Sequence, residues 1–221
     1  MFDRLISLIG IDKFKKLESI NVLVVGLGGV GGYAFEALIR SGIKNITIVD
    51  GDVIEESNLN RQIITSNNNI GASKTDEAKT RALDINPNLN IKTINEFINK
   101  DNFDLLFKDK YDYVIDACDD LNVKLLLILN ANKYKLISSM GTANKTNPSL
   151  FTITDLDKTN NDPIARILRK KIKDLKISRK FKVVSSTETP VQNEKLGTNS
   201  YIPGIAGLLC ASYIINDITK K

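Results

Sequence analysis

The chain has 221 residues, 42% hydrophobic and 26% charged, which is typical of one folded domain and excludes a disordered or fibrous protein. It has no histidine and only two cysteines, Cys118 and Cys210, which excludes Ser-His-Asp hydrolysis, histidine-ligated zinc, a disulfide scaffold and a four-cysteine zinc site. The net charge is +5. No uninterrupted apolar segment reaches the about 18 to 20 residues of a membrane span, and no signal peptide is evident, so we expect a cytoplasmic protein without membrane contact.

Short apolar segments alternate with segments that have helical spacing of apolar residues. The predicted strands cover residues 22–25, 46–49, 91–94, 113–115 and 136–139, and the predicted helices cover residues 30–40, 75–85 and 121–132. Such alternation is typical of an α/β fold with a doubly wound, mostly parallel sheet, in which ligands bind at the carboxyl ends of the strands. We therefore expect a single domain over residues 1–221.

The pattern changes after the fifth predicted strand. Residues 149–154 predict an antiparallel strand, and Pro163 predicts the start of a helix. Residues 181–184 predict a short strand, and a last helix is expected after Pro203. We therefore expect an antiparallel C-terminal extension with a basic helical insertion at about 163–182.

That insertion contains most of the positive charge. Residues 166–182 hold nine Lys and Arg residues against one acidic residue and so have a net charge of +8, while the rest of the chain sums to −3. The pattern favours a polyanionic partner over a merely solvated surface. The candidate contacts are Arg166, Arg169, Lys170, Lys171 and Lys173.

A glycine-rich segment, Gly26-Leu27-Gly28-Gly29-Val30-Gly31-Gly32, directly follows the first predicted strand. Glycines let the backbone approach a bound group, and the first amides of the next helix point at it unpaired, so the expected ligand is anionic. With Asp50 nineteen residues after Gly31, the spacing also fits the dinucleotide fingerprint. This segment alone leaves NAD(P) or flavin binding, another nucleotide, or a tight turn without a ligand open.

Polar segments further along the chain favour a triphosphate. In order, they are Asp50-Gly51-Asp52, Asn58-Leu59-Asn60-Arg61-Gln62, Gly71-Ala72-Ser73-Lys74 and Asp116-Ala117-Cys118-Asp119-Asp120. Cations near the phosphates and a carboxylate-held Mg²⁺ would neutralise the charge that moves onto a pyrophosphate leaving group, which a dehydrogenase does not need. Simpler interpretations remain: Asp116 or Asp119 could cap a helix, Lys74 could be solvated, and Cys118 could be a small core residue.

Together, the glycine segment and these four segments resemble the ThiF/MoeB/E1-like adenylating superfamily over about residues 20–141. The resemblance implies an E1-like, Rossmann-related fold that binds ATP and Mg²⁺. It implies that Asp50 and Asp52 hold the ribose and its surroundings, that Asn58, Arg61 and Lys74 contact the phosphates, and that Asp119 holds the metal. Gln62 and the glycines Gly26, Gly28, Gly29 and Gly31 would position ATP.

The opening Phe2-Asp3-Arg4 resembles the N-terminal segment of the same superfamily, in which an arginine reaches the ATP of the other protomer. The resemblance thus implies a homodimer in which Arg4 acts in trans. Arg4 would join Arg61, Lys74 and Asp119 in stabilising the adenylation transition state.

Later segments resemble one branch, the tRNA threonylcarbamoyladenosine dehydratases (the TcdA or CsdL family). They are Met140-Gly141 through Asn147-Pro148, Asp162-Pro163-Ile164-Ala165-Arg166, Ser185-Ser186-Thr187-Glu188 and Ile202-Pro203-Gly204. Members use ATP to activate the carboxylate of threonylcarbamoyladenosine 37 in tRNA, and the neighbouring carbamoyl function then closes a ring with loss of water. The basic segment would bind the RNA backbone.

The branch also suggests a cysteine desulfurase or sulfur-acceptor partner. Three alternatives stay open at this point. They are an adenylating enzyme for a sulfur-carrier protein, an NAD(P)-binding Rossmann protein, and a non-enzymatic RNA-binding module.

Overall fold

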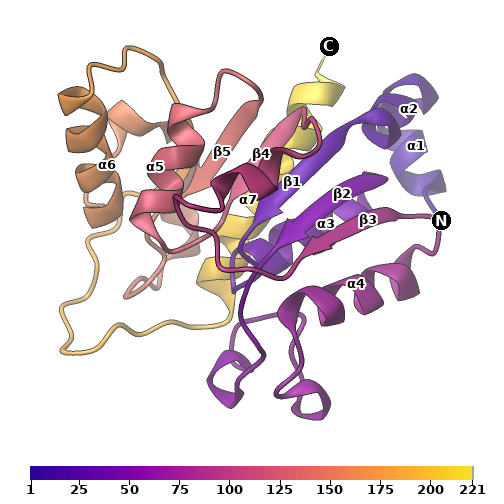
Figure 1. Ribbon diagram of the computed structural model, residues 1–221, viewed down its shortest axis with the longest axis horizontal. Helices are drawn as coiled ribbons and strands as arrows, with labels where there is room; N and C mark the ends of the chain where they lie inside the picture. The colour runs from indigo at the N-terminus through magenta and orange to yellow at the C-terminus, as the bar shows by residue number, and fades with distance from the viewer. Residues whose placement is uncertain (221) are drawn as a thin grey trace.

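A computed structural model describes residues 1–220 of the chain. Its centre is a seven-stranded sheet with strand order β3-β2-β1-β4-β5-β7-β6 (Figure 1). Only the β6–β7 pair is antiparallel, at the edge, so the predicted fold class is confirmed. The strands are β1 (Asn21–Val25), β2 (Asn45–Val49), β3 (Asn90–Ile94), β4 (Tyr113–Asp116), β5 (Lys135–Ser139), β6 (Phe151–Asp155) and β7 (Lys182–Ser186).

Successive side chains of a strand point to opposite faces of the sheet. Helices cover both faces, so both sets of side chains are buried. Val22 and Val24 of β1 pack into one hydrophobic cluster, and Leu23 and Val25 pack into the other. The first cluster includes residues of α2 (Ile11–Ser19), α3 (Gly31–Arg40), α4 (Lys74–Ile85) and α7 (Tyr201–Thr219). The second includes residues of α5 (Leu121–Leu129), α6 (Pro163–Asp174) and the 3-10 helix η3 (Phe103–Phe107).

The remaining helices are short. Helix α1 (Asp3–Ile9) precedes α2 at the N-terminus, and neither was expected from the sequence. The other 3-10 helices are η1 (Glu56–Asn58), η2 (Asn67–Asn69), η4 (Pro148–Leu150) and η5 (Leu156–Lys158).

Several expected boundaries differ from the structure. The helix expected over residues 121–132 ends at Leu129, and the strand expected over residues 149–154 is Phe151–Asp155. The basic insertion expected at 163–182 is helical only as far as Asp174, after which the chain runs without helix or strand to Lys182, the first residue of β7. The helix expected after Pro203 already begins at Tyr201. Proline is tolerated there because the first amides of a helix have no partner within it.

Helix α7 is long and apolar enough, by length and mean hydropathy of 1.3, to cross a membrane, although the sequence had predicted no such segment. In the structure its buried residues, among them Ile202, Ala206 and Cys210, belong to the core. It also packs closely on α3, since a Cβ at Gly207 would lie 2.2 Å from the Val30 carbonyl oxygen. The core thus accounts for the buried part of α7, which is 44% of its most apolar stretch.

Candidate active site

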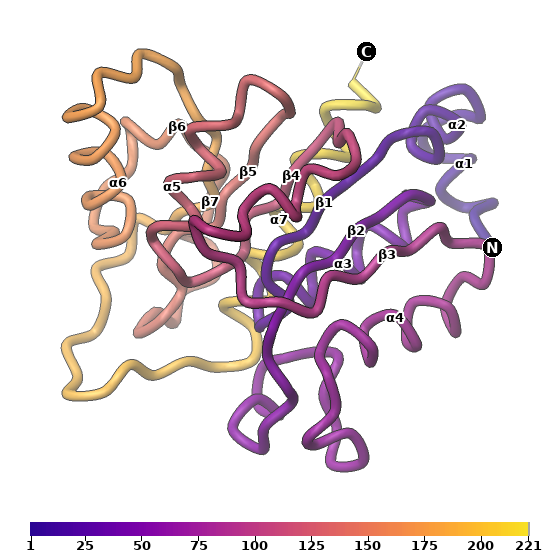
Figure 2. The backbone as a smooth tube through the Cα atoms, in the orientation of Figure 1, coloured from indigo at the N-terminus to yellow at the C-terminus, as the bar shows by residue number. Residues whose placement is uncertain are grey.

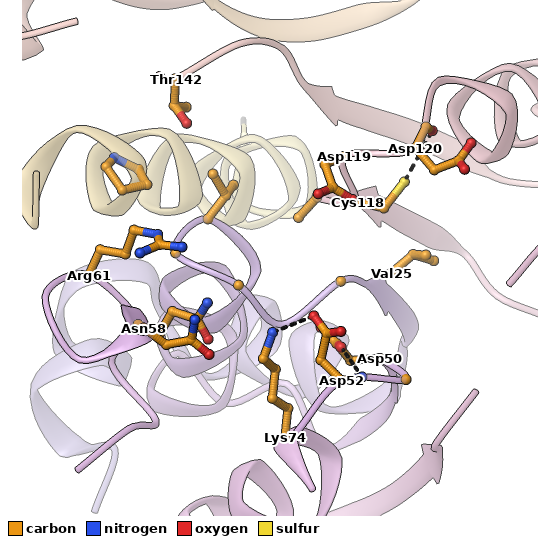
Figure 3. A pocket seen from close by; sticks show the side chains of 18 of the residues that line it. Val25, Asp50, Asp52, Asn58, Arg61, Lys74, Cys118, Asp119, Asp120 and Thr142 are labelled. Atoms are coloured by element: carbon orange, nitrogen blue, oxygen red, sulfur yellow. Dashed lines mark hydrogen bonds and ion pairs between the residues drawn. The ribbon is translucent and has the colours of Figure 1, made fainter. Parts of the chain in front are cut away.

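A cavity of about 520 Å³ opens at the carboxyl ends of β1, β2 and β4 (Figure 3). The sheet order changes direction between β1 and β4, and ligands of open α/β sheets bind at such a point. Most of the predicted nucleotide site lines this one cavity: Gly26, Gly28, Gly29, Asp50, Asp52, Asn58, Arg61, Gln62, Lys74 and Asp119. The described chain therefore brings together polar segments that are separated in sequence.

Two residues that were predicted to act on the nucleotide, Gly31 and Arg4, do not line the cavity. A Cβ at Gly31 would lie 1.8 Å from the Gly26 carbonyl oxygen, so Gly31 allows α3 to pack tightly on the end of β1. Arg4 is exposed on α1. Its expected action on a second protomer stays a prediction.

The glycine segment is shaped by its contact with the end of β4. Gly26 has a φ of 91°, and a Cβ there would lie 2.8 Å from the Ala117 carbonyl oxygen. The Asp50 carboxylate fixes the segment further, because its Oδ2 accepts a hydrogen bond of 2.6 Å from the Leu27 amide. The pKa of the Asp50 carboxyl is above its ordinary value, because burial, the largest effect, raises it. The nearby Lys74 charge and the amides of Asp52 and Leu27 lower the pKa, but by less. Asp50 therefore holds the loop in addition to the ribose role predicted for it.

Lys74 is the first residue of α4, directly after the N-cap Ser73. Its ammonium group donates to Asp52 Oδ2 at 2.6 Å, as the dashed line in Figure 3 shows. The Lys74 side chain is only 5% exposed, whereas that of Asp52 is 50% exposed. Lys74 is thus not the solvated lysine of the simpler interpretation but a cation held in place in the cavity wall.

The η1 region supplies Asn58, Arg61 and Gln62. Asn58 is buried, and its Oδ1 accepts from the Glu55 amide, so it stabilises the turn that places Arg61. The Arg61 guanidinium donates to the Ser57 carbonyl oxygen at 2.7 Å. Gln62 is 6% exposed, and its Oε1 has no hydrogen-bond partner within residues 1–220. A buried acceptor without a partner is costly, so a ligand donor is expected to satisfy it.

The aspartates after β4 have three different environments. Asp116 is fully buried and accepts from the Lys124 ammonium group, so it does not cap a helix. Asp120 caps α5 by accepting from the Asn122 amide at 2.6 Å and the Val123 amide at 3.0 Å. Asp119 is exposed in the cavity, with no hydrogen bond or ion pair to its carboxylate from the described residues. Its oxygens are therefore available for a cation.

The surroundings of both thiols favour the protonated form. Burial, and secondly the charge of Asp116, raise the pKa of Cys118 well above its ordinary value, and Cys118 Sγ donates to Asp116 Oδ1 at 3.1 Å. Burial raises the pKa of Cys210 in α7 to about 12. Because the thiolate is the nucleophile, neither environment suits covalent catalysis by cysteine. Cys118 nevertheless lines the cavity.

Sequence reasoning missed several lining residues. Thr142 and Ala143 come from the segment after β5, and Leu196, Gly197 and Thr198 come from the loop before α7. Phe97, which is 66% exposed, comes from the segment after β3. Thr142 and Ala143 lie within the segment Met140–Pro148 that carries part of the family resemblance, but the resemblance assigns them no role. The other lining residues lie in irregular segments that no local motif marks.

The cations predicted to bind a polyanion divide into two groups on α6. Arg166, Lys170 and Lys173 are exposed and lie on one face, at spacings of four and three residues. Arg169 and Lys171 are half-buried, and Arg169 donates to the Thr159 carbonyl oxygen at 2.9 Å. At the end of the basic segment, Lys182 pairs with Asp155 at 2.8 Å. The exposed stripe is therefore narrower than the sequence suggested.

Comparison with known proteins adds independent information. A model of the ThiF family matches residues 2–221. The tRNA threonylcarbamoyladenosine dehydratase of Bacillus subtilis (strain 168) is 35% identical over 96% of this chain and 92% of its own length. The Escherichia coli (strain K12) protein of the same name is 36% identical over 80% of this chain and 70% of its own length.

Solved structures agree with these matches. The crystal structure of the E. coli tRNA threonylcarbamoyladenosine dehydratase TcdA in complex with ATP superposes with a TM-score of 0.93 at 32% identity. The match covers 98% of this chain and 93% of that chain. The similarity thus includes both the segments around the cavity and the C-terminal part with α6 and α7.

Proposed function

Because the chain belongs to the ThiF family, among its tRNA threonylcarbamoyladenosine dehydratases, we propose that it uses ATP to dehydrate threonylcarbamoyladenosine 37 in tRNA to the cyclic form. The observation that supports this most is the convergence of Lys74, Arg61 and Asp119 on the cavity behind the glycine segment. The two cations Lys74 and Arg61 and the unpaired Asp119 carboxylate, near the start of α3, suit a triphosphate rather than NAD(P).

ATP would lie along the wall formed by the glycine segment and η1. The amides at the start of α3 would face the phosphates, and Asp52 would share the ribose with Asp50. Lys74 and Arg61 would stabilise the charge that develops on the pyrophosphate. Gln62 Oε1, the buried acceptor without a partner among residues 1–220, would take a donor from the nucleotide.

The proposed reaction has two steps. First, a carboxylate oxygen of the threonyl group attacks the α-phosphorus, the bond from that phosphorus to the bridging oxygen breaks, and pyrophosphate leaves. Second, the neighbouring carbamoyl group attacks the activated acyl carbon, AMP leaves, and the carbamoyl proton passes to solvent. Since the nucleophile belongs to the same molecule as the acyl group, no cysteine or histidine of the enzyme is required.

The residues present also suit the Mg²⁺ that the family implies. Within residues 1–220 no three acidic or cysteine side chains form a complete metal site. Mg²⁺ bound with a nucleotide needs only one or two carboxylates besides the phosphates, and Asp119 offers one that is not engaged elsewhere. Asp119 would hold the ion, whose charge would offset that of the phosphates.

The exposed stripe Arg166, Lys170 and Lys173 would bind the tRNA backbone. Its three cations lie on one side of α6 and are not paired with acidic side chains in the described structure. Arg169 and Lys171 would contribute less, because both are half-buried. Phosphate contacts of this kind position an RNA without reading its sequence.

The proposal includes a homodimer in the cytoplasm, without membrane contact. Arg4 lies outside the cavity of its own protomer, as action in trans requires, and would reach the ATP of the partner. The proposal also includes a cysteine desulfurase or sulfur acceptor as a partner. This chain would supply no catalytic thiol of its own, because Cys118 and Cys210 both favour the protonated form.

The test is ATP–pyrophosphate exchange with three acceptors: tRNA bearing threonylcarbamoyladenosine, the same tRNA without the modification, and a sulfur-carrier protein ending in Gly-Gly. We expect exchange only with the modified tRNA. Exchange with the carrier protein alone would favour the sulfur-carrier alternative. Tight NAD(P)H binding without exchange would favour the dinucleotide alternative, and RNA binding without exchange a non-enzymatic module.

A further inference from the structure

The two sides of the cavity differ in charge. Lys74, Asp52 and Arg61 lie on the side of the glycine segment and η1. Figure 3 shows Thr142 on the opposite side, facing Lys74 and Asn58 across the cavity. The residues of that second side that come from the segment after β5 and the loop before α7 are uncharged, and we call them the neutral wall: Thr142, Ala143, Leu196, Gly197 and Thr198.

The neutral wall joins two segments that are distant in the sequence. Asn144, with a φ of 57°, donates its amide to the Gly197 carbonyl oxygen at 2.8 Å, and its Oδ1 accepts from the Gly197 amide at 2.6 Å. Asn199 Nδ2 donates to the Lys145 carbonyl oxygen at 3.2 Å. These bonds fix the end of an otherwise extended loop, which Figure 2 shows at the lower left between β7 and α7.

A buried ion pair connects the neutral wall to α6. Asp162 Oδ1 caps α6 through the Ala165 amide at 3.0 Å. Asp162 Oδ2 accepts from the Gly141 amide at 3.1 Å and from the Lys145 ammonium group at 3.2 Å. The Lys145 and Asp162 side chains are 1% and 0% exposed. Because separating such a pair would leave a buried charge without a partner, the wall and the start of α6 are held together as one unit.

We infer that the neutral wall binds the modified nucleoside and directs its carboxylate at the α-phosphate; this inference rests on the proposed function. An RNA bound to the exposed face of α6 is attached to the unit that holds the wall. Leu196, which is 85% exposed, and Ala143 offer apolar contact to the base and the threonyl methyl group. The hydroxyl groups of Thr142 and Thr198 offer hydrogen bonds to its polar edges.

The absence of charge in the neutral wall also suits the reaction. A lysine or arginine there would pair with the substrate carboxylate and weaken it as a nucleophile. The cations instead lie across the cavity, where the phosphates would be, so they offset the repulsion between the two anions. The wall thus leaves the carboxylate reactive while its position is fixed.

The test compares Leu196→Glu with Val191→Glu. Val191 lies in the same loop and is 49% exposed, but it does not line the cavity. A carboxylate at position 196 would repel the substrate carboxylate, so the KM for modified tRNA should rise about tenfold over that of Val191→Glu. The Kd for ATP should stay the same in both variants. Leu196→Gln, which removes the apolar contact without adding a charge, should raise the KM by less than Leu196→Glu does.

Each outcome decides between the two proposals. If Leu196→Glu and Val191→Glu have the same KM in an otherwise active enzyme, the assignment of the neutral wall is overturned while the proposed function stands. If the unaltered enzyme forms no AMP with modified tRNA, the proposed function fails, and this inference fails with it.

Discussion

The Lys124 ammonium group donates to both carboxylate oxygens of Asp116 at 3.1 Å, and neither side chain is more than 1% exposed. Lys124 also donates to the Ser139 carbonyl oxygen at 2.8 Å. The pair therefore connects α5 with the ends of β4 and β5. Asp116 directly precedes the turn in which Cys118 and Asp119 line the cavity.

Lys124→Met should destabilise the protein by about 3–5 kcal/mol, because it leaves the Asp116 carboxylate buried without a counter-ion. Urea unfolding followed by circular dichroism measures the change. The double variant Asp116→Asn/Lys124→Met removes both charges and should recover part of the stability. An unaltered unfolding midpoint for Lys124→Met would contradict the importance of the pair.

Lys74→Ala should abolish ATP–pyrophosphate exchange but leave the protein folded. It removes a cation from the cavity, and its partner Asp52 stays half-exposed rather than buried alone. Lys79→Ala is the matched control, since Lys79 lies on the same helix but is exposed and does not line the cavity. Asp119→Ala should behave like Lys74→Ala. Unchanged exchange in Lys74→Ala would remove Lys74 from the catalytic residues.

Replacing Arg166, Lys170 and Lys173 together by glutamine should weaken tRNA binding and reduce its salt dependence. The log–log slope should become shallower by about one unit for each phosphate that the helix no longer neutralises. The control replaces Lys15, Lys16 and Lys79 by glutamine. These lysines are exposed on α2 and α4, which lie at the other side of the molecule from α6 in Figure 1. Filter binding at several salt concentrations gives both slopes. Equal slopes for the two triple variants would show that α6 is not the RNA-binding helix.

The variant Cys118→Ala should still form AMP. In the unaltered protein, the Cys118 thiol should react slowly with iodoacetamide at neutral pH. Burial and the Asp116 charge raise the pKa of its thiol, so little thiolate is present. Mass spectrometry of the alkylated protein measures the rate. Loss of turnover in Cys118→Ala, with ATP binding intact, would instead indicate covalent sulfur or acyl transfer.

Glu36 should make stability depend on pH. Burial raises the pKa of its carboxyl, but hydrogen bonds from Arg81 and Arg40 outweigh burial, so the pKa is below its ordinary value. A lowered pKa in the folded state contributes stability above the unfolded value of about 4.3, and this contribution disappears as pH falls through the folded pKa.

Urea midpoints measured across the acidic range test this dependence. Glu36→Gln should be less stable than the unaltered protein at neutral pH, and the difference should vanish in acid. Glu194→Gln, an exposed control, should show no such difference. A constant difference between Glu36→Gln and the unaltered protein at every pH would show that ionisation of Glu36 does not contribute.

The parts of the fold that were predicted correctly have local signals. Val22–Val25 is an apolar segment followed at once by glycines, and the polar segments follow strand ends. Helix α1 has no buried residues, so no amphipathic pattern reveals it. Lys124 and Lys145 acquire their roles only when distant strands and loops meet. Thr142 and Leu196 likewise reach the cavity only in the folded chain. The residues of the glycine segment and η1 could therefore be predicted to line one site, and the neutral wall could not.

The most direct measurement incubates the purified protein with ATP, Mg²⁺ and tRNA bearing threonylcarbamoyladenosine, then analyses nucleotides by chromatography and digested nucleosides by mass spectrometry. We expect AMP and pyrophosphate in equal amounts, with the modified nucleoside lighter by one water. ATP left intact beside a substrate of confirmed modification, or ADP formed in place of AMP, would contradict the account.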